Sequence, residues 1–191
     1  GALIKIRSPI SNKKALLEIG ASGPIAGFLI TIPLLFYGLT KSTVVEINSE
    51  SSIVLGESLI MKFFTFLVFP NLSQSQDIML HPIGFASWIG LLITMLNLLP
   101  IGQLDGGHIV YAIFGKNHYM ISKIFFLFLI PLSFLSINWI IWGLVIFILM
   151  RTLKHPPILD VDKVLTLREK LIGFVCLLIF IISFIPVPFE I

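Results

Sequence analysis

The chain has 191 residues, of which 57% are apolar and only 12% are charged, and its mean hydropathy is +1.02. A soluble domain carries about 25% charged residues, so this composition excludes an ordinary water-soluble protein, a disordered chain and a coiled coil. The net charge of +3 is too small and too spread out for a nucleic-acid-binding protein, and a single cysteine excludes a disulfide framework. We therefore expect a helical protein that crosses a lipid bilayer several times.

The first part of the chain predicts a strand, a membrane span and a shorter helix. Residues 1–8 alternate apolar and basic side chains, which is typical of the end of a β-strand or ribbon. Ser11 or Asn12 can cap a helix that enters the first span, at about 15–39. The apolar run 59–69 is too short to cross a bilayer, so it predicts an interfacial or re-entrant helix.

The rest of the chain predicts a short helix at 106–114 and four further spans, at about 83–99, 119–135, 138–150 and 171–185. The fold class that follows is an all-α polytopic membrane protein. It would have about five transmembrane helices in a single membrane domain over 1–191, with the strand at 1–8 as a remnant of a ribbon.

The basic residues are distributed unequally between the two sides that this topology implies. Eleven of the 13 Lys and Arg fall on the side of the first turn and the loop 151–170, and only Lys41 and Lys62 fall on the opposite side. The positive-inside rule therefore makes the first side cytoplasmic, or its equivalent in a plastid.

The segment 97–108, NLLPIGQLDGGH, places Asp105 between two apolar runs, at membrane depth. Ionisable groups there are costly and indicate a functional site by default. Pro100 and the three glycines of the segment permit non-helical backbone, which survives in a bilayer only where protein or a water-filled cavity covers it. Asp105 on a broken helix can ligate a metal or move protons. It can also simply cap the helix at 106–114, and the residues alone leave these readings open.

Asn97-Leu98-Leu99-Pro100, followed by Leu104-Asp105-Gly106, resembles the N-x-x-P-x-x-x-L-D-G motif of the site-2 proteases, a family of intramembrane zinc metalloproteases. The small residues from Gly20 to Gly27 are similar to the G-P-x-A-G span of that family. His81-Pro82 and His155-Pro156-Pro157 resemble its bacterial, archaeal and plastid branch, which implies a multi-pass protein of a bacterial or archaeal plasma membrane or a plastid membrane.

The resemblance implies a role for each matching residue. Asp105 would be the third ligand of a catalytic Zn²⁺, and Asn97 would hold the scissile carbonyl or stabilise its developing negative charge. Gly106 and Gly107 would let the backbone approach the metal closely. The substrate would be a transmembrane segment of another protein.

The other two ligands and the general base of the family come from an H-E-x-x-H motif on an earlier helix. None of the four histidines of this sequence, His81, His108, His118 and His155, belongs to such a motif. We expect the chain to be the C-terminal portion of a longer protein whose preceding part carries H-E-x-x-H. The chain alone should be inactive, because a catalytic zinc normally takes three protein ligands.

Two further features of the sequence, a histidine and a glycine-rich segment, each have two possible interpretations. His108 could support the metal site or be a neutral, hydrogen-bonded histidine, whereas the other three histidines are expected at interfaces or in loops. Gly20-Ala21-Ser22-Gly23 has the G-x-S-G form of the nucleophile in rhomboid-type serine proteases. Alternatively, Gly20, Gly23 and Gly27 share one helix face and serve close helix packing, which is the interpretation we favour.

The function that the sequence predicts is therefore that of a site-2-protease-like zinc metalloendopeptidase that cleaves transmembrane segments. The alternative is a non-proteolytic membrane protein, either an inactive protease homologue or a proton- or ion-coupled transporter. An acid at a broken helix also suits a transporter, but the sequence lacks the repeated halves that such a protein would show.

Overall fold

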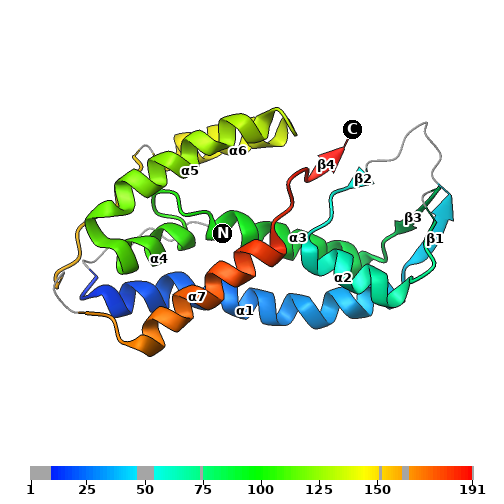
Figure 1. Cartoon of the computed structure of the whole chain (residues 1–191), viewed down its shortest axis with the longest axis horizontal. Helices are drawn as coiled ribbons and strands as arrows, with labels where there is room; N and C mark the ends of the chain where they lie inside the picture. Colours follow the sequence, from blue (N-terminus) through cyan, green and yellow to red (C-terminus); the bar gives the residue numbers. More distant parts are fainter. Residues whose placement is uncertain (1–9, 47–53, 74, 151, 161–163, 191) are drawn as a thin grey trace.

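The computed structural model describes residues 10–46, 54–73, 75–150, 152–160 and 164–190, and most of these residues are helical (Figure 1). The helices are α1 (Lys13–Thr40), α2 (Leu59–Val68), α3 (Pro82–Leu98), α4 (Asp105–Phe114), α5 (His118–Ser133), α6 (Asn138–Met150) and α7 (Leu167–Ser183), with the 3-10 turn η1 (Gly115–Asn117) between α4 and α5. The helix positions agree with the apolar runs of the sequence. The predicted strand at 1–8 lies outside the described residues.

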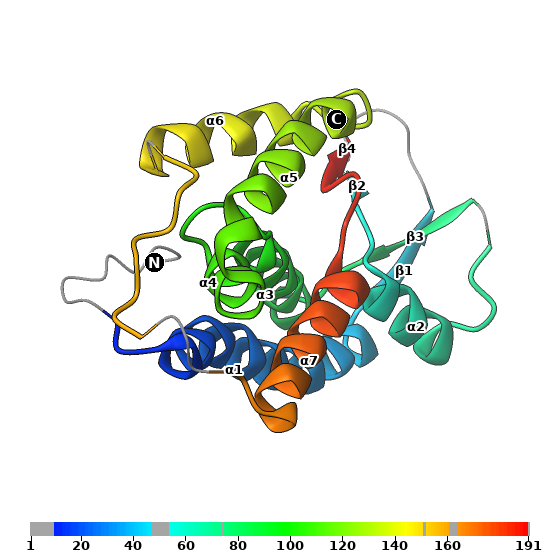
Figure 2. The ribbon, with the colours of Figure 1, turned by 60° about the vertical axis from the view of Figure 1, so that its left-hand side comes forward.

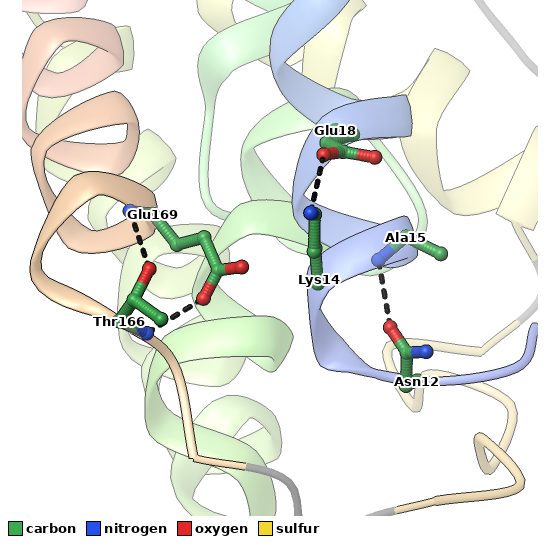
Figure 3. Close-up of polar contacts among 6 residues, drawn as sticks. All are labelled: Asn12, Lys14, Ala15, Glu18, Thr166 and Glu169. Carbon is green, nitrogen blue, oxygen red and sulfur yellow. Dashed lines mark hydrogen bonds and ion pairs between the residues drawn. The ribbon is translucent and has the colours of Figure 1, made fainter.

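Side-chain caps fix the start of the first and last helices (Figure 3). Asn12 Oδ1 accepts a hydrogen bond from Ala15 N at 3.0 Å, as one of the two predicted caps of α1. At α7, Thr166 and Glu169 form a capping box, with Thr166 N donating to Glu169 Oε2 at 2.6 Å. This box explains why α7 begins at Leu167, ahead of the apolar run from which the span at 171–185 was predicted.

Helix α1 packs against α3, α4 and α7, and α4 lies between α1 and the pair formed by α5 and α6 (Figures 1 and 2). The largest buried side chains include Trp88 on α3 and Trp139 on α6, neither of which is exposed. The Trp88 indole N–H donates to Gly56 O and that of Trp139 donates to Pro186 O, each at 2.7 Å. These bonds attach two connecting segments to the helical core.

Two small antiparallel sheets lie at one end of the helices, and the sequence pattern did not predict them. Strand β1 (Thr43–Glu46) pairs with β3 (Gln76–Met79), and β2 (Val54–Leu55) pairs with β4 (Phe189–Glu190). Each strand has four residues or fewer, so none shows a long period-two pattern.

The outer helix surfaces are strongly apolar. Large apolar side chains that are more than half exposed include Phe128 and Ile130 on α5 and Leu144, Phe147 and Ile148 on α6. A soluble monomer rarely exposes contiguous apolar patches of this extent, so these surfaces identify a membrane protein.

Helix length supports fewer membrane spans than the sequence pattern predicts. In the part of the chain that the structure describes, Lys13–Thr40 and the helical stretch Asp105–Ser133 are long and apolar enough to cross a bilayer. Helices α2, α3 and α6 are apolar but shorter. Five transmembrane helices are thus not confirmed and remain a prediction.

Candidate metal centre

The helix break predicted around Pro100 lies between α3 and α4, and side chains of α5 hold its backbone. Gly102 has a φ of +55°, a left-handed conformation that favours glycine. Its N–H donates to Ser122 Oγ at 3.0 Å, and its carbonyl accepts from His118 Nε2 at 3.1 Å. Ser122 Oγ also donates to Pro100 O at 3.1 Å. The backbone groups that the break releases are therefore satisfied inside the protein, as a bilayer requires.

Asp105 is the first residue of α4 and is 9% exposed. Leu104 occupies the N-cap position, and no side chain caps this helix. The alternative that Asp105 is merely the N-cap is therefore wrong. Within the described residues its carboxylate has neither a hydrogen bond nor an ion pair. A buried, unpaired carboxylate is costly, which makes it a strong ligand candidate.

Glycines on two helices bring backbone close to Asp105. A Cβ at Gly20 of α1 would lie 2.8 Å from Asp105 O, and one at Gly23 would lie 3.7 Å from Asp105 Oδ2. On α4 itself, a Cβ at Gly106 would collide with Leu98 O, and one at Gly107 would collide with Gly102 O. The glycines of the motif thus fit α4 against the break, and those of α1 fit that helix against Asp105.

Asn97 lies in the last turn of α3, and its side chain is half-buried. No hydrogen bond to its amide group occurs among the residues that the structure describes. Asn97 and Asp105 therefore flank the same break from its two ends, each with an unpaired polar group. Their roles in binding a metal or a carbonyl remain predictions.

The environment of Ser22 favours the interpretation that the glycines of α1 serve helix packing. It is exposed, and its hydroxyl donates to Ile19 O within the same helix at 3.2 Å. No histidine of the described chain is bonded to it, so a serine nucleophile lacks its base here.

The histidines are arranged in a way that the sequence pattern did not predict. His81 caps α3, with Nδ1 accepting from Ile83 N at 3.2 Å. The other three meet: His108 Nδ1 and His155 Nε2 are 2.7 Å apart, and the His118 and His155 ring centroids are 5.8 Å apart. His108 and His118 are buried inside the protein. Because His108 and His155 are 47 positions apart, no local spacing could have signalled this contact.

A complete metal site is not present in the described part of the chain, where no three His, Cys, Asp or Glu side chains are grouped to hold an ion. Asp105 nevertheless fits one position of a zinc site, because a buried carboxylate oxygen without a competing partner is a normal Zn²⁺ ligand.

Comparison with known proteins identifies the family. The model of peptidase family M50 matches residues 1–132. A probable zinc metalloprotease of Arabidopsis thaliana, EGY1, chloroplastic, is 28% identical over 195 residues, which cover 98% of this chain and 35% of that protein. EGY2 of the same plant is 31% identical over 119 residues, covering 61% of this chain and 21% of that protein. EGY2 of Oryza sativa subsp. indica is 28% identical over 201 residues, covering all of this chain and 35% of that protein.

This chain therefore spans about a third of the length of EGY1, and no solved structure matches it. The family match includes the α1 glycines, Asn97 and Asp105, and it ends before His155. These relatives are named as zinc metalloproteases, which agrees with zinc as the cofactor. These matches agree with the N-x-x-P-x-x-x-L-D-G motif and the broken helix of this chain. The chain belongs to peptidase family M50, the family of the site-2 proteases.

Proposed function

We propose that this chain is a membrane portion of an intramembrane zinc metalloendopeptidase that hydrolyses peptide bonds in transmembrane segments of other proteins. The observation that carries the proposal is Asp105, a buried carboxylate with no partner in the described chain, located at a helix break. Asp105 supplies the third zinc ligand, and an H-E-x-x-H motif elsewhere in the full protein supplies the other two and the general base.

Zn²⁺ bound at this site would polarise the scissile carbonyl and activate a water molecule. The residues of this chain have two tasks in that scheme. Asp105 contributes a negatively charged oxygen that binds the metal. Asn97, whose amide is unpaired, donates a hydrogen bond to the carbonyl oxygen and stabilises the charge that develops on it.

An inactive homologue that only binds membrane segments, or a proton- or ion-coupled transporter, is the competing function. The family assignment favours proteolysis over transport. An active protease differs from an inactive homologue in having H-E-x-x-H in the remainder of the protein.

Replacing Asp105 by Asn in the full-length protein tests the proposal. Asn keeps the size of the side chain but lacks the negative charge of a zinc ligand. We expect a severe loss of bound zinc and of cleavage, with the fold preserved as judged by far-ultraviolet circular dichroism. Zinc content by atomic absorption and cleavage of a membrane-embedded substrate are the measurements. A variant that keeps both would overturn the protease assignment.

Two matched variants complete this test. Asp77→Asn removes an acid from β3, away from the break, and should leave zinc content and cleavage unchanged. Asn97→Ala should keep its zinc but lose cleavage rate, by about 10²- to 10³-fold if the amide acts as an oxyanion-hole donor. Loss of zinc from Asn97→Ala would contradict the role that we assign to Asn97.

A further inference from the structure

Three histidines and one tyrosine meet where α4, α5 and the loop before α7 come together. We call His108, Tyr111, His118 and His155 the histidine clasp. His155, from the loop, stacks on Tyr111 with ring centroids 4.3 Å apart and meets the His108 ring edge-on at 4.9 Å. His108 and His118 are each only 1% exposed, so the clasp is an internal contact between α4, α5 and the loop.

The loop that carries His155 is itself anchored. Leu159 N donates to Ile10 O at 3.0 Å, and Asp160 N donates to Ser11 O at 2.9 Å. Ile158 is buried in a core cluster with residues of α1, α4 and α7. His155 therefore extends toward α4 from a segment that is attached to the start of α1.

The hydrogen-bond partners define the tautomers of the His155–His108 pair. His155 Nδ1 is 2.6 Å from Pro156 O, and because a carbonyl oxygen only accepts, Nδ1 carries the proton. Burial lowers the pKa of His155, so the ring is neutral near pH 7 and its Nε2 is an acceptor. His108 Nδ1 is then the donor in the 2.7 Å bond between the two rings.

This assignment leaves His108 Nε2 as a bare acceptor when the ring is neutral, and that atom is buried without a hydrogen-bond partner in the described chain. The pair is not itself a metal site. Two nitrogens on one tetrahedral zinc stand about 3.3 Å apart, from a Zn–N distance of about 2.0 Å. The observed 2.7 Å separation is that of a hydrogen bond.

We propose that His155 is a positioning residue of the Asp105 site: by bonding to His108 and stacking on Tyr111, it holds the first turns of α4, and with them Asp105, against the helix break. The inference rests on the proposed zinc role of Asp105. His108 follows Asp105 by three residues on the same helix, so a shift of α4 moves both side chains. The two glycines between them pack against the break through their backbone alone, so His108 adds a side-chain contact to this turn of α4.

The test compares His155→Phe with His155→Gln in the full-length protein. Phe keeps the stacking on Tyr111 but cannot accept the His108 hydrogen bond, whereas Gln Oε1 can accept it. We expect His155→Phe to lose about 10- to 100-fold in zinc affinity, as is typical when a partner beyond the ligands is removed. Its kcat should fall while KM stays unchanged, and His155→Gln should restore most of both losses. His81→Asn keeps an α3 cap and serves as the histidine control.

Two measurements that do not depend on proteolysis separate this inference from the proposed function. In the wild-type protein, ¹⁵N NMR should show His108 protonated at Nδ1, and finding it protonated at Nε2 instead would overturn the inference without any variant. In the metal-free protein, amide exchange over 105–108 should be faster in His155→Phe than in His155→Gln. Equal exchange, or equal zinc affinity, in the two variants would also overturn it. If Asp105→Asn proves silent, the proposed protease function fails, while the NMR and exchange results still decide whether the clasp holds α4.

Discussion

The carboxyl groups of Asp105 and Glu57 are both shielded from solvent, but they differ in the polar and charged groups that surround them. Glu57 precedes α2 beside a cavity of about 830 Å³, where it accepts a hydrogen bond from Thr65 Oγ1 at 3.4 Å and feels the positive charge of Lys62. Asp105 has no such compensation in the described chain. An acid that the fold itself does not satisfy points to a partner outside these residues, whereas Glu57 is explained by its own surroundings.

Glu57 gives a prediction about pH. Burial raises the pKa of this carboxyl above its ordinary value. A raised folded-state pKa stabilises the protein below the unfolded-state pKa, and this contribution is lost as pH rises through the folded-state value. Glu57→Gln removes the titration but keeps an acceptor for Thr65. We expect the Tm of the variant to rise relative to that of the wild type as the pH increases above 4.5, the ordinary value for this group, measured by thermal unfolding in detergent. A difference in Tm that is independent of pH would contradict this.

The site residues differ in whether a short local sequence motif could predict them. Asn97 and Asp105 could be predicted because they lie in one short motif with its own proline and glycines. The histidine clasp could not, because its members come from two helices and a loop and depend on how α4 packs against α5. The absence of a cap bond at Asp105 also required the structure, since Asp and Leu at adjacent positions leave the start of the helix ambiguous.

At the scale of elements, the contact between α1 and α4 depends on glycine, and the positions along α1 are not equivalent. A Cβ at Gly20 would approach the Asp105 carbonyl and His108 Cβ to 2.8 and 2.9 Å, which backbone cannot easily relieve. A Cβ at Gly23 would make only an ordinary contact, at 3.7 Å from Asp105 Oδ2.

Gly20→Ala and Gly23→Ala should therefore differ in sign. Overpacking at Gly20 should destabilise the protein by about 1–3 kcal/mol. Gly23→Ala should be neutral or slightly stabilising, because Ala favours a helix interior over Gly by about 1 kcal/mol. Thermal unfolding measures both. Ser22→Ala, at an exposed position, should change neither stability nor cleavage. Complete loss of cleavage in folded Ser22→Ala would contradict the packing role and revive the serine mechanism.

The helices were largely predictable and the strands were not, for physical reasons. Long apolar runs that end at a helix-breaking residue, such as the run that ends near Pro100, predict helices in a bilayer. The pairing of β1 with β3 joins residues that are 30 to 36 positions apart across α2, and its four-residue strands have no pattern of their own. Register of this kind comes from the packing of the helices that bring the strands together.

At the scale of the whole molecule, the elements are arranged with two distinct ends. The four strands lie together at one end of the helices, whereas the loop with His155 lies near the opposite end of α1, at its N-terminus (Figures 1 and 2). From the charge asymmetry of the sequence we expect these ends to lie on opposite sides of the membrane.

Cysteine labelling tests this orientation. Ser73→Cys lies in an exposed turn before β3, and Leu159→Cys replaces a side chain that is 73% exposed in the loop before α7. A membrane-impermeant maleimide should label the two sites from opposite sides, with Leu159→Cys reached from the cytoplasmic or stromal side. Native Cys176 is 2% exposed and should give little background. Labelling of both sites from one side would overturn the topology.

The support that α5 gives to the break around Pro100 has a consequence for how a protease built on it would work. Straightening α3 and α4 into one helix would strip Ser122 and His118 of their backbone partners in a buried place. We therefore expect the helix break around Pro100 to keep its conformation and not to act as a hinge. A transmembrane substrate would therefore bind to a site whose backbone does not change conformation. To expose a peptide bond, the substrate itself would have to unwind a helical turn.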